Sequence, residues 1–248
     1  MKNIKNNPII IPLEFRVACT VTKIEIQQVL QIFIDHILFY DSISNVYSEG
    51  YTEATRTTSD YLESKEGKHR TSKSFRKCQD TAINCIKYIQ KLIKNAPNEV
   101  DANRKKAELP IIKLYNVMER FYTPTNKLYI NEFSTIHLSK DFCITCEILA
   151  CYPNEFLEYF MNNISLAELH AREDLKEYVQ NVPLASFLKI VNGFRKDNPQ
   201  NVTVDQVEID FYDKAQELRL SLFNIRDVEE RIKILKEFYL SHYNYMNP

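Results

Sequence analysis

The chain has 248 residues and a formal net charge of −1, and a chain of this length buries enough surface to fold without disulfides or metals. It contains only three glycines, so left-handed turns, tight hairpins and glycine-rich phosphate loops must be rare. This composition argues against a β-rich fold and against a nucleotide-binding α/β fold. We therefore expect an all-α protein, a bundle or array of about eight helices in a single domain over residues 1–248.

The N-terminal segment predicts no export signal. Its apolar run, Ile9 to Ile11, ends at Pro12 and is too short for the core of a signal peptide. No run of about 18 apolar residues occurs in the chain, so we expect no membrane-spanning helix and no membrane partner. Six cysteines in a chain without an export signal indicate reduced thiols and a cytoplasmic location.

Two patterns open the chain. From Leu13 to Val21 apolar and polar residues alternate, which is the period of a short half-buried strand or of an extended arm packed on helices. The pattern changes at Thr22, because Thr22 and Glu25 fit a capping box. This box predicts a strongly apolar helix that runs to about Tyr47.

Residues 48–72 are poor in large aliphatic side chains and rich in Ser, Thr, Glu and Lys. Two of the three glycines, Gly50 and Gly67, lie here. This composition predicts a long mobile loop within the domain.

An amphipathic helix is predicted from Ser72 to Asn95. Its apolar residues recur at the 3-4-3-4 spacing of a buried seam: Phe75, Cys78, Ala82, Cys85, Ile89 and Leu92. Because Cys78 and Cys85 lie on this seam, we expect both to be small buried hydrophobes. Pro97 ends the pattern, and Pro110 ends or kinks the charged segment that follows.

The second half of the chain predicts a series of helices with clear start signals. They begin at about Ser139, at Pro153, at the capping box of Ser165 and Glu168, after Pro183, and at the capping box of Thr203 and Gln206. A last helix follows the break at 224–226. Because its connection to the preceding helix is so short, the two helices are expected to form a C-terminal hairpin.

Positive charge concentrates in one region. From Lys68 to Lys106, eleven Lys and Arg residues outnumber three acidic ones. Six cations of the predicted helix 72–95 fall within an arc of roughly 100° opposite its apolar seam, and we call them the basic ridge: Lys73, Arg76, Lys77, Lys87, Lys91 and Lys94. Such a ridge can neutralise phosphates without reading bases, so it predicts docking to nucleic acid or to an acidic protein.

The competing interpretation of the basic ridge is an ordinary solvated helix face, because lysine is common throughout the chain. A helix-turn-helix would favour nucleic acid more strongly. The nearest match, 183–196 followed by Val204 onward, has a connector that is too long and contains a proline.

A catalytic pocket is a second hypothesis. His36 and Tyr40 stand four residues apart on one helix face and, with Glu147, could line a pocket in which the histidine acts as a base or a ligand. The other histidines are scattered singly, and the chain contains none of the common nucleophile, phosphate-loop or metalloprotease motifs. We therefore favour a structural histidine and assign no catalytic residue.

The segment 141–153 holds three cysteines and allows a zinc site, for which the four candidate ligands are His137, Cys143, Cys146 and Cys151. Aliphatic residues between the thiols argue against it, since a zinc knuckle would have to expose them. Ser139 suits an N-cap and Pro153 suits the first turn of the next helix, so we predict a central helix and no metal. If Glu147 on this helix is buried, it must be paired or have a raised pKa.

These patterns together predict a non-catalytic cytoplasmic protein with a regulatory or interaction role, whose basic ridge docks nucleic acid or an acidic partner. We expect no cofactor. Two alternatives stay open: a helical-bundle enzyme with a pocket near His36, and a protein-protein scaffold that uses the C-terminal hairpin and could form a homodimer.

Overall fold

The computed structural model describes residues 9–44, 52–65, 71–121, 127–130, 134–197 and 206–247. These residues are mostly helical, with one two-stranded antiparallel sheet, so the predicted all-α fold is confirmed. The helices are shorter and more numerous than the eight or so expected from the sequence. Among the described residues, no single helix is long and apolar enough to cross a membrane.

The chain divides into two compact units, and each unit consists of two separate segments of the chain. Unit 1 consists of Met1–Ile10 and Gln27–Phe160, and unit 2 consists of Ile11–Ile26 and Met161–Pro248. The expectation of a single domain stays a prediction.

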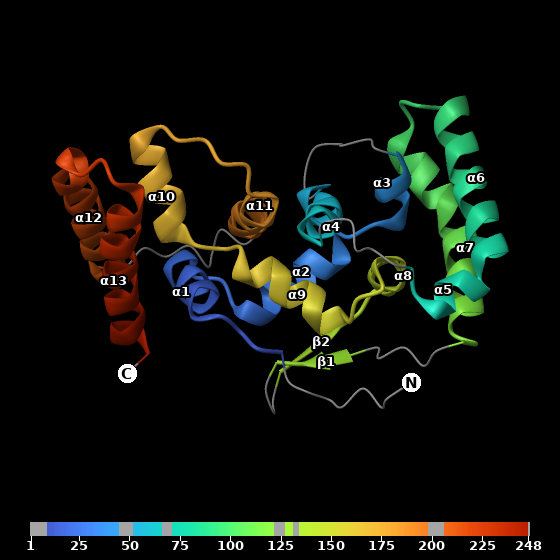
Figure 1. Cartoon of the computed structure of the whole chain (residues 1–248), viewed down its shortest axis with the longest axis horizontal. Helices are drawn as coiled ribbons and strands as arrows, with labels where there is room; N and C mark the ends of the chain where they lie inside the picture. The colour runs from blue at the N-terminus through green and yellow to red at the C-terminus, as the bar shows by residue number, and fades with distance from the viewer. Residues whose placement is uncertain are drawn as a thin grey trace. The chain divides into compact units, whose positions relative to one another are not determined.

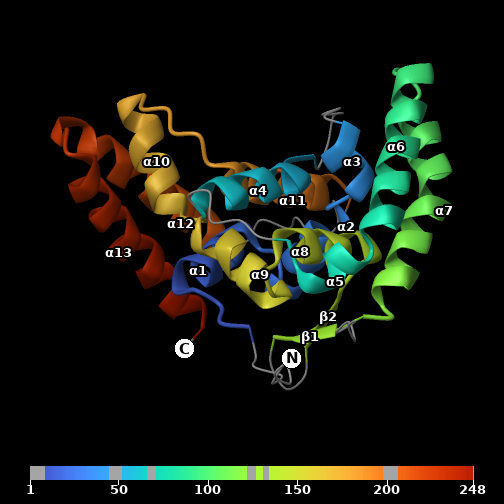
Figure 2. The same cartoon turned by 45° about the vertical axis from the view of Figure 1, so that its right-hand side comes forward.

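Unit 1 holds most of the described helices and the sheet (Figure 1), with these bounds: α2 Ile26–Asp35, α3 Phe39–Ser44, α4 Thr52–Ser64, α5 Lys73–Lys77, α6 Gln79–Asn95, α7 Val100–Met118, β1 Lys127–Tyr129, β2 Thr135–His137, α8 Lys140–Leu149 and α9 Pro153–Asn162. Helices α6 and α7 lie side by side in both views (Figures 1 and 2). The predicted seam of α6 is confirmed, because Cys78, Ala82, Cys85 and Ile89 are buried in a core cluster with residues of α3, α7 and α8.

The small sheet is a feature that the sequence did not predict. β1 and β2 pair antiparallel, with Leu128 opposite Ile136. The hairpin is hydrogen-bonded to α2 through the side chain of Gln31. The side-chain oxygen accepts from the backbone N–H of His137 at 2.8 Å, and the side-chain NH₂ donates to the backbone carbonyl of His137 at 3.1 Å.

Helix α4 lies where the sequence predicted a mobile loop. That prediction is wrong for Thr52–Ser64, and residues 48–51 and 66–70 lie outside the described residues. The helix buries Thr55, Thr57 and Thr58. Thr57 and Thr58 donate their hydroxyl hydrogens to carbonyls of the preceding turn, at 2.9 and 2.6 Å. Threonine can therefore face a core when its hydroxyl is satisfied locally, and a search for aliphatic residues misses such a helix.

Unit 2 contains α1 Leu13–Thr22, α10 Leu166–Leu175, α11 Val182–Asp197, α12 Gln206–Ser221, the short 3₁₀ helix η2 Leu222–Asn224 and α13 Val228–Met246. Helix α13 packs along α10 and α1. Helices α12 and α13 lie side by side (Figures 1 and 2), and the ring of Phe211 stacks on those of Phe238 and His242, with centroids 5.4 and 3.9 Å apart. This arrangement is the predicted C-terminal hairpin.

Helix α1 corrects the prediction of an N-terminal strand or arm. It buries Phe15, Val17, Ala18, Cys19 and Val21. The alternation of apolar and polar residues therefore belongs to a helix that is buried on most of its sides. A period-2 pattern over so few residues cannot be told from a helix that is covered on most sides.

The predicted helix from Thr22 to Tyr47 is also wrong in its start. Thr22 is the last residue of α1, where its hydroxyl donates to the carbonyl of Ala18 at 2.7 Å, so it does not form the predicted capping box. The described part of that segment forms α2 and α3, and Tyr47 lies outside the described residues.

Candidate functional site

The basic ridge lies on α5 and α6, and all six of its side chains are exposed. None of the six forms an ion pair within the described residues. Lys77 lies over the ring of Phe121, with its ammonium nitrogen 5.2 Å from the ring centroid. Asp80, in the first turn of α6, is the single acidic residue from Lys73 to Lys94. The ridge therefore carries a local excess of positive charge.

The helix that carries the ridge is not continuous, which corrects the prediction of one helix over 72–95. At Cys78 the backbone has φ −100° and ψ 8°, and its N–H donates to the carbonyl of Phe75, three residues earlier, at 2.9 Å. The ridge consequently has two segments. The first holds Lys73, Arg76 and Lys77 on α5, and the second holds Lys87, Lys91 and Lys94 on α6.

Glu147 holds the start of α5. The Ser72 hydroxyl oxygen accepts a hydrogen bond from the backbone N–H of Phe75 at 2.9 Å, and the hydroxyl donates to the carboxylate of Glu147. Burial raises the pKa of Glu147, and the bond from Ser72 opposes that rise. Glu147 is half-buried, and it has both a hydrogen-bond partner and a raised pKa. Its observed contact is with the N-cap of the basic segment.

Two basic residues on the adjacent helix α7 are neutralised by carboxylates, in contrast to the ridge. Arg104 forks onto the buried Asp41, with two N···O distances of 2.9 Å. Lys106 lies 3.7 Å from a carboxylate oxygen of Glu99. The ridge therefore differs from these cations in having no ion-pair partner within the described residues.

His36 and Tyr40, the other two pocket candidates, each have a structural environment of their own. The Nδ1 atom of His36 lies 2.7 Å from the carbonyl oxygen of Ile32. Tyr40 is buried in the core cluster, and burial raises its pKa. A pocket shared by His36, Tyr40 and Glu147 stays a prediction, and these contacts give it no support.

The cysteine segment forms the predicted helix α8. Ser139 caps it, with its hydroxyl oxygen accepting from the N–H of Phe142 at 3.1 Å, and Pro153 begins α9. Cys143 and Cys146 are buried. Burial raises the pKa of Cys146, which keeps this thiol protonated and unreactive. Within the described residues, no three His, Cys, Asp or Glu side chains are grouped so as to hold a metal ion.

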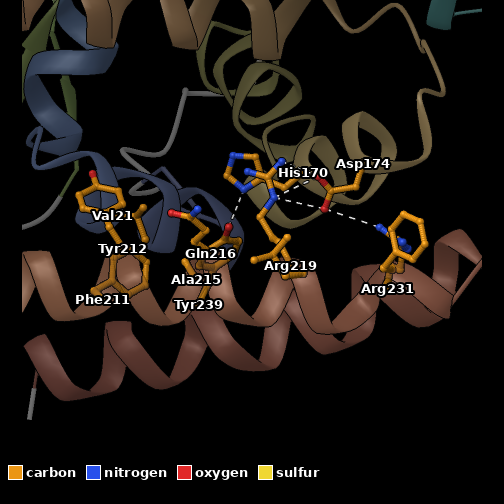
Figure 3. A pocket seen from close by; sticks show the side chains of 12 residues that line it. Val21, His170, Asp174, Phe211, Tyr212, Ala215, Gln216, Arg219, Arg231 and Tyr239 are labelled. Atoms are coloured by element: carbon orange, nitrogen blue, oxygen red, sulfur yellow. Dashed lines mark hydrogen bonds and ion pairs between the residues drawn. The ribbon is translucent and has the colours of Figure 1, made fainter.

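Unit 2 contains a pocket of about 620 Å³ that the sequence did not reveal (Figure 3). It lies among α10, α12, η2 and α13, with Val21 of α1 at its wall. In Figure 3, Phe211 and Tyr212 lie toward one end, and His170, Asp174 and Arg219 gather toward the other.

A hydrogen-bonded network forms the polar end of the pocket. Arg219 forks onto Asp174, with its shortest N···O distance at 2.6 Å. Arg231 is 2% exposed and donates to the carbonyls of Ile225 and Leu222 at 2.6 and 2.7 Å. Its third nitrogen, Nη1, lies 3.6 Å from Asp174 Oδ2 and makes no hydrogen bond within the described residues.

His170 and Tyr239 are both neutral near pH 7. The Nδ1 atom of His170 lies 2.5 Å from the Tyr239 hydroxyl oxygen. Burial, assisted by the nearby Arg219 cation, lowers the pKa of His170 to about 4, and burial raises the pKa of Tyr239 to about 12. Since neither group titrates near pH 7, the pair is suited to hydrogen bonding and poorly suited to proton transfer at that pH.

One sequence signal could have pointed to this pocket. His170 and Asp174 stand four residues apart and therefore share a face of α10. Arg219 and Arg231 come from distant helices, and only the fold brings them to Asp174. No protein-family model, no curated protein and no solved structure matches this chain.

Proposed function

We propose that the protein is a non-catalytic regulatory or interaction protein of the cytoplasm whose basic ridge docks on the phosphate backbone of nucleic acid. The observation that carries this proposal is the basic ridge, whose six exposed cations, in two segments on α5 and α6, have no ion-pair partner within the described residues. The free state of all six cysteines supports a reducing compartment.

The spacing of the ridge favours nucleic acid over an acidic protein. Lys87, Lys91 and Lys94 share one exposed face of α6 and span about 10 Å of its axis at 1.5 Å per residue. Each strand of DNA presents one phosphate charge per about 3.4 Å of its axis. The exposed amide of Gln90 lies between Lys87 and Lys91 in the sequence, and that of Asn84 lies about one turn before Lys87. Such groups also donate to phosphates. A regular row of cations and donors suits a regular row of anions.

Binding of this kind is expected to be strongly dependent on salt and weakly dependent on sequence, because it rests on the release of counterions. If all six cations contact phosphates of a duplex, the slope of log K against log salt concentration is expected to reach about −5. Fluorescence anisotropy with a labelled DNA duplex, from about 50 to 200 mM salt, measures this slope.

A charge-reversal variant tests the site itself. Lys87→Glu with Lys91→Glu is expected to weaken binding at least about tenfold and to reduce the slope by about 2. The matched control, Lys214→Glu with Lys233→Glu, changes the net charge equally at exposed positions of unit 2 and is expected to bind like the unaltered protein. Binding that is absent at low salt, or equal in the two variants, would refute the proposal. Stronger competition by polyglutamate than by DNA would show an acidic protein as the partner.

A scaffold that uses the C-terminal hairpin is a second candidate, because large apolar side chains are exposed along it: Val207, Ile209, Leu220, Phe223, Tyr245 and Met246. This function predicts a homo-oligomer that persists at low and high salt, whereas docking by the basic ridge predicts no such assembly. Light scattering at two salt concentrations separates the two.

A further inference from the structure

We infer that the pocket of unit 2 binds a small amphipathic monocarboxylate, with the carboxylate at Arg219 and the apolar body against Phe211 and Ala215. This site lies in a different unit from the basic ridge, and it does not depend on the proposed nucleic-acid function.

The pocket has the size and shape for such a ligand. Its volume of about 620 Å³ lies within the range of about 300–1,000 Å³ that holds small molecules. One face of α12 lines it, with Phe211, Ala215 and Arg219 at successive turns. Arg219 comes eight positions after Phe211, so the apolar and charged ends stand about 12 Å apart along the helix. Figure 3 shows Gln216 between the aromatic end and Arg219.

The polar end has more donors than acceptors. Arg219 and Arg231 share the single carboxylate of Asp174 among the lining residues. Glu173 also lies 3.9 Å from Arg219, but it is 55% exposed and therefore screened by water. The amide of Gln216 makes no hydrogen bond within the described residues. Among the residues that line the pocket, the two arginines and Asp174 therefore leave a single net positive charge, and the Gln216 amide is a further donor beside them.

These features select the chemical class of the ligand. A single excess positive charge suits a monoanion, because a dianion would require two cations without a counter-charge. Guanidinium and amide donors match the planar oxygens of a carboxylate. Phe211, Ala215 and Leu220 form an apolar wall. This wall would leave a small hydrophilic anion without contacts, so it favours a carboxylate ligand that also carries an aromatic or branched apolar group.

A matched pair of probes tests the inference on the full chain. 1-Naphthaleneacetate has the proposed chemistry, and 1-naphthaleneacetamide has the same shape without the charge. Calorimetric titration is expected to show 1:1 binding of 1-naphthaleneacetate, at least about tenfold tighter than binding of 1-naphthaleneacetamide. The reason is that a hydrogen bond to a charged group contributes more to affinity than a hydrogen bond to a neutral group. Equal affinity for both probes, or no binding of the acetate to the folded protein, overturns the inference.

Two variants locate the site. Arg219→Met is expected to weaken acetate binding about tenfold and to leave amide binding unchanged. The control Arg172→Gln also removes an arginine from the neighbourhood of α10, but Arg172 pairs with Glu168 and Glu177 and does not line the pocket. Acetate binding is expected to be unaffected in this control, and an equal loss in both variants would contradict the site.

A reporter variant keeps the test independent of Arg219. Leu220 lines the pocket and is 68% exposed, so Leu220→Trp is compatible with the fold. The unaltered chain contains no tryptophan, so the fluorescence of the variant reports on this position alone. Its fluorescence is expected to change as the acetate saturates. An unchanged signal at saturation would place the ligand elsewhere and overturn the inference.

Discussion

His170 is held in its neutral form by its surroundings. Burial is the main cause, and the Arg219 cation adds to it, so the pKa of His170 falls to about 4 while Asp174 acts in the opposite direction. In the unfolded chain the imidazole titrates near its ordinary pKa of about 6.5. Between these two values the unfolded state binds more protons than the folded state. The contribution of neutral His170 to the free energy of unfolding is therefore fully present above about pH 6.5 and is lost as the pH falls toward 4.

The expected loss is measurable. From pH 7 to pH 5, the His170 contribution to the free energy of unfolding is expected to fall by about 2 kcal/mol. His170→Asn keeps an acceptor for Tyr239 and does not titrate, so it is expected to lack this loss. Urea denaturation at the two pH values compares the proteins. A His170 imidazole signal that titrates near pH 6.5 by NMR would contradict the prediction.

Arg231 illustrates a residue whose place could not be predicted. Ile232, Leu235 and Tyr239 recur at helical spacing and are buried on one face of α13. Arg231 adjoins that face and is fully buried as well, because its guanidinium donates to the carbonyls of Leu222, the first residue of η2, and of Ile225, which follows η2. These hydrogen bonds depend on the path of the backbone around η2. The spacing of apolar residues along α13 does not predict that path.

At the scale of elements, the sequence predicted the start of a helix correctly where the capping side chain and the N–H that it accepts from are close together in the sequence. Ser139 and Ser165 cap α8 and α10 through hydrogen bonds to the N–H three residues later. These bonds are complete within a few residues, so sequence alone predicts them. The starts of α1 and α4 were missed, because burial of Phe15 and of Thr57 depends on distant neighbours.

Ser72 connects two elements, which gives a prediction at this scale. Ser72→Ala removes the N-cap of α5 and the hydroxyl that donates to Glu147. The free energy of unfolding is expected to fall by about 1–2 kcal/mol, since a lost N-cap alone costs about 1 kcal/mol and the half-buried Glu147 carboxylate loses a donor. Chemical denaturation measures the change.

The control for this change keeps the hydroxyl. Ser72→Thr is expected to remain within about 0.5 kcal/mol of the unaltered protein, because threonine can make the same two bonds. Faster exchange of the Phe75 amide hydrogen in Ser72→Ala would show that the loss is local to α5. An alanine variant as stable as the threonine variant would mean that the cap contributes nothing.

At the scale of the molecule, unit 2 is built from residues at both ends of the chain. Helix α1 supplies part of its core. Phe15 is fully buried and packs edge-on against Phe187, with ring centroids 6.0 Å apart. Glu14 accepts a hydrogen bond from Ser165 at 3.0 Å and lies 3.3 Å from the ammonium nitrogen of Lys236. The sequence placed this segment as a strand or arm, so it could not predict that unit 2 is discontinuous.

This organisation predicts which fragments fold. Fragment 27–160 contains almost all of unit 1 in one continuous segment and is expected to fold by itself. Fragment 161–248 lacks α1 and is expected to remain largely unfolded, because the contacts of Phe15 and Glu14 are missing and apolar surface of α13 is exposed. A permuted chain that continues from residue 248 through a flexible linker to residues 11–26 is expected to regain the fold. Circular dichroism and the dispersion of amide signals in NMR measure folding of all three. Cooperative unfolding of fragment 161–248 at the same midpoint as the permuted chain would show that α1 is dispensable and that the core of unit 2 is complete without it.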